Sequence, residues 1–480
     1  MISRLRAALI FGMLLALANP SDADAQFAGG GFGGGQGGGF GGGQGGGFGG
    51  QGQGGGFGQG GVGGIAIDAS GVVAPVFQKE LASKLAQQRL QAFAEKNFPA
   101  DLNRPSELRM ISIVQLEKAC QSFADEKKHV TPEIQYLAGL QRIDYVFLSP
   151  DSGDLVIAGP AEGFAPDEMG RVVGVTTGRP PIRLDDLIVA LRTVPRTSQI
   201  GCSIDPTPSG LQAFGDYVRR NSTPATTAVI QQRFREMAKA LGQQDVSVFG
   251  VPGDSHFAQV LVEADYRMKL MATGLEKPRL KGFLSHLQAI RPGQNTFQRW
   301  WFTPLYDAFQ QSEAGDAFAF SGQRLQLMAE EERVSAEGIR TAAKANGAST
   351  QKFAAQFTKR FEELAKVVPV FAELQNLTDL AVLAALMQKK QLAQQVGWKM
   401  SLFLDEDQTP LVKGNVPKHV QSVYGTRLAG RLILGLVAGG VELNPFQTVS
   451  STKFEPASRT LTAASTRARQ AADPGHWWLD

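Results

Sequence analysis

Four side chains in the middle of the sequence have the types used in general acid–base catalysis and metal-assisted hydrolysis. Asp205 follows one predicted strand, and Asp254-Ser255-His256 follows a later one. In open α/β sheets, ligands bind beyond the carboxyl ends of the strands. If the two strands are parallel neighbours, two carboxylates, a hydroxyl and an imidazole converge there. A carboxylate then orients His256 while its imidazole activates Ser255.

The same residues also have a structural interpretation. Asp254 is suited to cap the helix that follows it, Asp205 to form a turn, and His256 to lie on the surface in the first helical turn. Short polar side chains occupy caps and turns for local hydrogen-bonding reasons that need no ligand. We prefer this interpretation, so the catalytic residues stay unknown, with these four as candidates.

Other motifs of cofactor and metal chemistry are absent from the sequence. It contains no phosphate-binding Gly-rich loop followed by Lys-Ser or Lys-Thr, no Cys-x-x-Cys and no His-Glu-x-x-His. The five histidines stand far apart, so we predict no cofactor and no metal site. A net charge of +3 on 480 residues argues against nucleic-acid binding.

The elements that must position the candidates alternate between strands and helices. Apolar alternation predicts strands at 200–204 and 246–251, and residues 254–271 carry one apolar stripe of helical period. Asp185 and Asp186 suit the first turn of another helix, whose dipole favours negative charge. This order indicates an α/β fold with a mixed, at least partly parallel sheet and flanking helices.

Two β-hairpins are predicted from turn residues between apolar runs. The first joins 145–149 to 155–159 across Pro-Asp-Ser-Gly-Asp, and the second joins 317–320 to 325–328 around Gly322.

Composition divides the chain behind residue 72 into three parts. Residues 73–335 form the predicted α/β region, and 336–445 a mainly helical region packed on it. Residues 446–480 are rich in Ser, Thr and Ala and are predicted to be a mobile tail. The tail ends in an aromatic cluster at Trp477-Trp478, which docks either on the chain itself or on a partner.

Cys120 and Cys202 are the two cysteines, each on the apolar side of its predicted element. In an oxidising compartment they form a disulfide, which closes a loop of about 80 residues and stabilises by about 4 kcal/mol. The alternative is two separate buried thiols. The sequence leaves both open.

The first 25 residues have the features of a signal peptide. Two arginines precede the apolar stretch 7–18, and small residues follow at 23–25, so the mature chain is predicted to begin at Gln26. No later stretch reaches about 18 uninterrupted apolar residues. We therefore expect an exported protein, periplasmic or otherwise extracytoplasmic or secreted, with no transmembrane segment after cleavage.

Residues 26–68 form a Gly/Phe/Gln-rich, low-complexity arm. Of the 56 glycines, 26 lie between residues 29 and 64, where no residue is charged. Ordering glycine costs much backbone entropy and this segment has little to bury, so it is predicted to be disordered. The arm either acts as a spacer or mediates self-association or envelope and matrix contacts. Partners are otherwise unknown.

Several short blocks of the sequence are distinctive. They occupy residues 136–143 (YLAGLQRI), 158–163 (AGPAEG), 183–187 (RLDDL), 200–206 (IGCSIDP) and 264–269 (ADYRMK). These blocks resemble a secreted planctomycete family catalogued as domain of unknown function 1598, over about residues 108–441. The resemblance implies an exported bacterial protein and carries over no catalytic residue.

We therefore expect an exported bacterial protein of unknown function that is a non-enzymatic envelope or extracellular binding or structural component. The alternative is a hydrolase with its site near Asp205 and Asp254-Ser255-His256.

Overall fold

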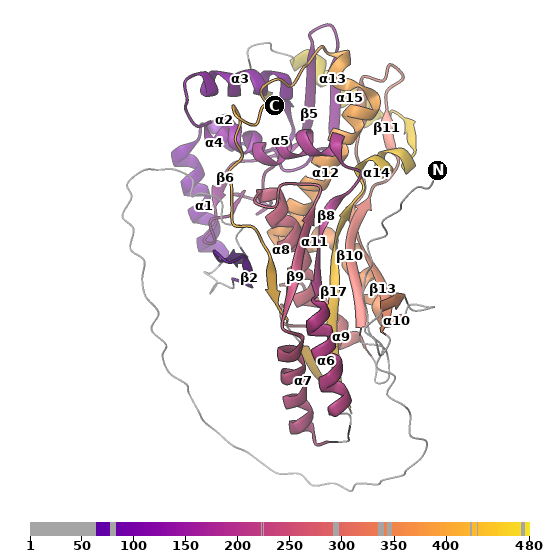
Figure 1. Ribbon diagram of the computed structural model, residues 1–480. Coiled ribbons are helices and arrows are strands. Elements are labelled where there is room, and N and C mark those ends of the chain that lie inside the picture. Colours follow the sequence, from indigo (N-terminus) through magenta and orange to yellow (C-terminus); the bar gives the residue numbers. More distant parts are fainter. Residues whose placement is uncertain are drawn as a thin grey trace.

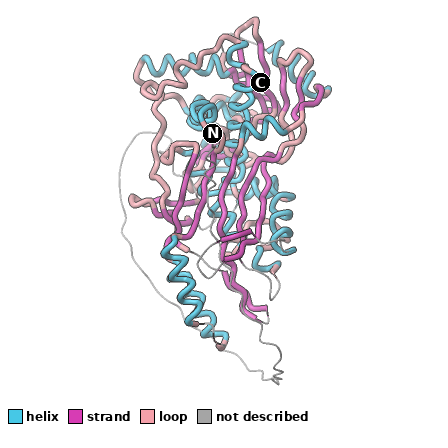
Figure 2. Tube along the Cα trace, turned by 45° about the vertical axis from the view of Figure 1, so that its right-hand side comes forward, coloured by secondary structure: helices cyan, strands magenta, loops and turns pink. Residues whose placement is uncertain are grey.

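The computed structural model describes residues 64–76, 83–221, 223, 225–290, 297–334, 340–342, 348–422, 425–429, 431–471 and 476–480. The predicted signal peptide and the arm up to residue 63 lie outside these residues. The molecule is elongated, with one sheet at the upper end and a larger one along the lower body (Figures 1 and 2). This confirms the predicted mixed α/β fold.

The larger sheet, the body sheet, has ten strands and mixed polarity. Strands β10 and β17 are parallel, as are β2 and β15, and the other neighbours are antiparallel. Its strands in spatial order are β1 (Ile65–Ile67), β2 (Val72–Pro75), β15 (His419–Gln421), β9 (Gln243–Phe249), β8 (Ile200–Pro206), β17 (Arg431–Leu443), β10 (Phe297–Leu305), β13 (Arg324–Val334) and β14 (Arg340–Ala342), with β16 (Gly425–Ala429) beside β17.

The upper sheet has seven strands. They are, in spatial order, β18 (Phe454–Pro456), β11 (Phe309–Gln311), β12 (Ala317–Ala319), β4 (Tyr145–Ser149), β5 (Asp154–Ala161), β3 (Ser106–Ser112) and β19 (Trp478–Leu479). A separate ribbon pairs β6 (Phe164–Pro166) with β7 (Val172–Gly174).

Of the two predicted hairpins, β4–β5 is confirmed. The second is wrong, because β12 pairs with β4 and β11 in the upper sheet while β13 pairs with β10 in the body sheet. The turn around Gly322 therefore links the two sheets instead of closing a hairpin.

Helices cover both sheets (Figure 1). They are α1 (Ser83–Asn97), α2 (Ala100–Asn103), α3 (Ile113–Asp125), α4 (Pro132–Gln135), α5 (Leu184–Thr193), α6 (Pro208–Arg220), α7 (Thr227–Leu241), α8 (His256–Ala272), α9 (His286–Ala289), α10 (Ala348–Lys359), α11 (Phe361–Val367), α12 (Pro369–Lys390), α13 (Leu392–Gln395), α14 (Pro445–Ser451) and α15 (Arg459–Ala471), with short 3₁₀ helices at Leu137–Gly139 and Val194–Arg196.

Helix α12 is the central element of the core. Among the described residues it alone is long and apolar enough to cross a membrane, and it is buried inside the fold. It contacts α5, α8, α11 and α14. The C-terminal region is helical as predicted, and β15, β16 and β17 from the same region also complete the body sheet.

The prediction that residues 446–480 form a mobile tail is wrong. Residues 446–471 form most of α14, β18 and α15, and Trp478 pairs with Ile111 of β3. The aromatic cluster therefore docks on the chain itself.

Candidate functional site

Asp205 and His256 do not converge, because the condition for it, parallel neighbouring strands, is not met. Strands β8 and β9 are neighbours but antiparallel, with Asp205 opposite Asp245 and Gly201 opposite Phe249. His256 follows the end of β9, so it lies beyond the opposite end of β8 from Asp205. The reason is the connection: the chain runs out along α6 and back along α7, which returns it to the strand end that it left (Figure 1).

Ser255 is the N-cap of α8, the role predicted for Asp254. Its hydroxyl donates to the Pro252 carbonyl at 2.6 Å and accepts from the Ala258 amide at 3.2 Å. Asp254 instead lies 3.6 Å from the ammonium of Lys413. Both hydrogen-bonding roles of the Ser255 hydroxyl are therefore taken by backbone groups of its own turn.

The His256 side chain is largely buried, with 9% of it exposed, and does not lie on the surface as the structural interpretation expected. Its Nδ1 lies 2.9 Å from the Asp186 carboxylate on α5, and its Nε2 lies 3.8 Å from Glu373 on α12. Asp186 lies in the first turn of α5 as predicted, but its pairing with His256, 70 residues away, was not predicted. No local pattern signals such a pair.

The ion pairs continue beyond Glu373, in what we call the His256 network. Arg171 contacts Glu373 and lies 2.6 Å from Glu263. Arg267 lies 3.4 Å from Glu263 and 2.6 Å from Glu276. The network comprises Arg171, Asp186, His256, Glu263, Arg267, Glu276 and Glu373, and most of these side chains are almost fully buried.

Burial shifts the pKa of two groups in this network, His256 and Glu263. It lowers the pKa of His256, and the positive Arg183 adds to this while Asp186 opposes it. Burial also raises the pKa of Glu263, against Arg171 and Arg267. A neutral His256 donates from Nδ1 to Asp186, which leaves Nε2 as the acceptor. A histidine that acts as a general base is held by a carboxylate in the same way. Here, however, the Nε2 atom faces the buried Glu373 carboxylate.

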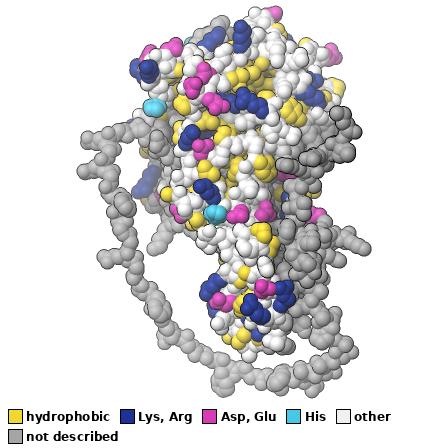
Figure 3. All heavy atoms as spheres, viewed as in Figure 1, with side chains coloured by type: hydrophobic (Ala, Val, Ile, Leu, Met, Phe, Trp, Pro, Cys, Tyr) yellow, Lys and Arg dark blue, Asp and Glu magenta, His cyan; other side chains and the backbone are white. Residues whose placement is uncertain are grey.

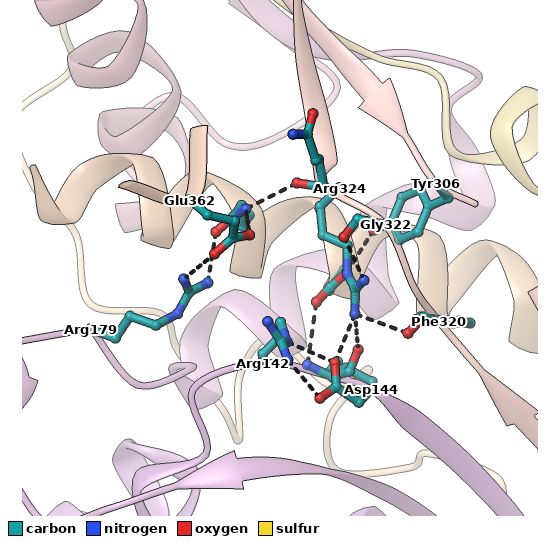
Figure 4. Close-up of polar contacts among 12 residues, drawn as sticks. Arg142, Asp144, Arg179, Tyr306, Phe320, Gly322, Arg324 and Glu362 are labelled. Carbon is teal, nitrogen blue, oxygen red and sulfur yellow. Dashed lines mark hydrogen bonds and ion pairs between the residues drawn. The ribbon is translucent and has the colours of Figure 1, made fainter. Parts of the chain in front are cut away.

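A second network joins α12 to the turn between the sheets (Figure 4). Arg324 lies 3.0 Å from Asp379 and 2.8 Å from Asp144, and the Tyr306 hydroxyl donates to Asp379 at 2.7 Å. Burial raises the pKa of Asp379, while Arg324 opposes the rise. We call this the Arg324 network. It fixes the two sheets to α12.

A cavity of about 480 Å³ lies at the carboxyl end of α8. Glu276 of the His256 network lines it, but both oxygens of its carboxylate bond Arg267. The hydroxyl of Ser285 and the amide of Gln288 are joined in the capping box of α9. The polar groups that line the cavity are thus largely hydrogen-bonded or ion-paired to other groups of the chain.

Cys120 and Cys202 are free, buried thiols, so the structure has the second of the two alternatives. Burial raises the pKa of Cys120 to about 12, which leaves it unreactive. Within the described ranges, no group of three or more His, Cys, Asp or Glu is placed to hold a metal ion.

Comparison with known proteins gives one match. Residues 202–283, which span most of β8 and all of α6, α7, β9 and α8, match a family model described as "Protein of unknown function (DUF1598)". No curated protein and no solved structure matches. Over these residues the chain is therefore similar to DUF1598, as its sequence blocks suggested.

Proposed function

We propose that this protein is an exported, non-enzymatic binding or structural component of the bacterial envelope or extracellular matrix. The observation that carries the proposal is the pair α6 and α7, the α6–α7 hairpin. It lies in the segment that matches the family model and projects from the body of the molecule (Figures 1 and 2). An element that projects in this way is suited to contact a partner.

The hairpin has its own small core and a basic surface. Phe214, Val218 and Leu241 form that core, separate from the main one. The two helices carry five basic and two acidic side chains. These charged side chains gather at the lower end of the molecule in Figure 3. Such a surface favours anionic envelope polymers or lipid headgroups.

Two sequence features support export and a spacer role for the glycine-rich segment. Residues 1–25 have the pattern of a signal peptide. In the segment that follows, 26 of the residues between 29 and 64 are glycine and none is charged. Such a composition is typical of a spacer between an attachment point and a folded body.

The hydrolase alternative has less support. Its nucleophilic version needs a hydroxyl directed at an imidazole, whereas Ser255 bonds its own helix turn and His256 bonds Asp186. Asp205 lies at the other end of its strand from this pair.

Co-sedimentation with isolated envelopes of the producing cells tests the proposal. We expect saturable binding by the mature chain from Gln26, reduced at least fivefold by Arg235→Gln with Lys239→Gln on the exposed face of α7. Lys352→Gln with Lys366→Gln, also exposed, is the matched control and leaves binding unchanged. Absence of binding, or a hydrolase activity that His256→Ala abolishes, would overturn the proposal.

A further inference from the structure

The edge of the upper sheet is covered by a very short strand. In β19, Trp478 pairs with Ile111 and Leu479 with Met110. One further backbone bond joins the Ser112 amide to the Trp477 carbonyl at 2.9 Å. An edge strand without a cover presents unpaired backbone groups, so residues 477–480 complete the sheet.

The same edge carries a buried cation. The Arg109 side chain is fully buried, and its Nε and Nη2 lie 2.8 and 2.9 Å from the two oxygens of Asp480. Its guanidinium also lies 4.7 Å from the centre of the Trp478 ring. Its other bonds go to backbone carbonyls, including those of Leu102 and Ala138. Asp480 is thus the carboxylate that balances this charge.

Apolar side chains of the upper sheet and of α15 lie beside the strand. Trp477, Trp478 and Leu479 share one lining with side chains from the upper sheet and from α15. Those side chains include Met110, Phe147, Val156 and Ala468. The edge of β3, Arg109 and these neighbouring side chains together form what we call the acceptor site.

Few contacts hold the strand of residues 477–480, but its departure exposes a site that needs a partner. Few backbone bonds and the ion pairs of one carboxylate, that of Asp480 with Arg109 and with the exposed Arg104 at 3.6 Å, retain residues 477–480. These residues therefore open locally at much lower cost than global unfolding. Opening leaves Arg109 buried without its carboxylate, which is unfavourable. The open acceptor site therefore favours a new strand that brings an aromatic ring and a carboxylate in the same register.

We propose that the acceptor site binds residues 477–480 of a second copy of this chain, so that copies associate by exchanging this strand. The second copy carries by identity every group that the site binds: the backbone edge, the indole over the guanidinium and the carboxylate. This inference is independent of the proposed function, because it needs only the geometry of β3 and β19.

A labelled peptide of residues 472–480 tests the site on the full chain. We expect saturable binding that an Asp480→Asn peptide weakens at least tenfold. The full chain with Asp480→Asn holds its own strand less firmly, so it binds the wild-type peptide more tightly than the wild-type chain does. Equal binding of both peptides, or no binding to a folded Asp480→Asn chain, overturns the proposal.

Light scattering of the full chain tests whether the partner is a second copy of the chain. We expect dimers that increase with concentration and that excess peptide dissociates. A chain that binds the peptide yet stays monomeric at several hundred micromolar would refute the second copy as occupant. Dimers that excess peptide leaves intact would refute exchange at this site.

Discussion

Arg171 is the residue on which the His256 network most depends. It is the cation that contacts both Glu263 and Glu373 in the interior. Removing one partner of a buried ion pair leaves an uncompensated charge, which costs far more than breaking an exposed pair.

Arg171→Met is therefore expected to lower the free energy of unfolding by about 3–5 kcal/mol, measured by urea denaturation. Arg89→Met is the matched control, because Arg89 pairs with Glu168 at 3.8 Å on the surface. It should cost less than about 1 kcal/mol. Similar losses in both variants would show that the buried network contributes little.

His286 gives the fold a dependence on pH. It is buried against Trp300 and Phe353, and burial lowers its pKa from 6.5 to about 4. Because the unfolded chain binds this proton more tightly, the stability that neutral His286 provides is complete above pH 6.5 and is lost as the pH falls towards 4.

We expect the wild type to lose about 3 kcal/mol more than His286→Phe between pH 7 and pH 4. Urea denaturation at intervals across this range measures the difference. Burial also lowers the pKa of His256. This residue therefore contributes to the pH dependence of stability that remains in the His286→Phe variant. Parallel pH profiles for the two proteins would exclude His286 as the cause.

Among the elements, α8 depends on the cap at Ser255. Its hydroxyl bonds both the Ala258 amide and the Pro252 carbonyl. Ser255→Ala should therefore reduce stability by about 1 kcal/mol, seen as a lower Tm. Asp254→Ala, which loses only a partly exposed contact with Lys413, should have a smaller effect. Loss of a hydrolase activity in Ser255→Ala with unchanged Tm would instead assign a catalytic role.

Most individual elements could be predicted from the sequence, because their signals are local. The β4–β5 hairpin follows from turn residues between apolar runs, and α8 follows from its apolar stripe. The pairing of elements could not. Periodicity places Asp205 at a strand end but does not say that the neighbouring strand runs the other way. The partnership of His256 with Asp186 depends on that same long-range packing.

At the scale of the whole molecule, α12 connects the two networks. Glu373 on this helix belongs to the His256 network, and Asp379 to the Arg324 network. The sheets are thus held to one buried helix by charged contacts as well as by apolar packing. The folded body is one interlocked unit, and the projecting hairpin and residues 477–480 lie at its periphery.

Association of the whole chain should depend on residues 477–480 and not on the glycine-rich arm. We expect a chain that begins at Gly64 to dimerise as the mature chain does, because the acceptor site lies in the folded body. A chain that ends at His476 should stay monomeric, because it has no strand to exchange. Sedimentation velocity of the three chains, with circular dichroism to establish folding, measures both effects. If removal of the arm abolishes association and removal of residues 477–480 does not, the arm is the adhesive element and strand exchange is wrong.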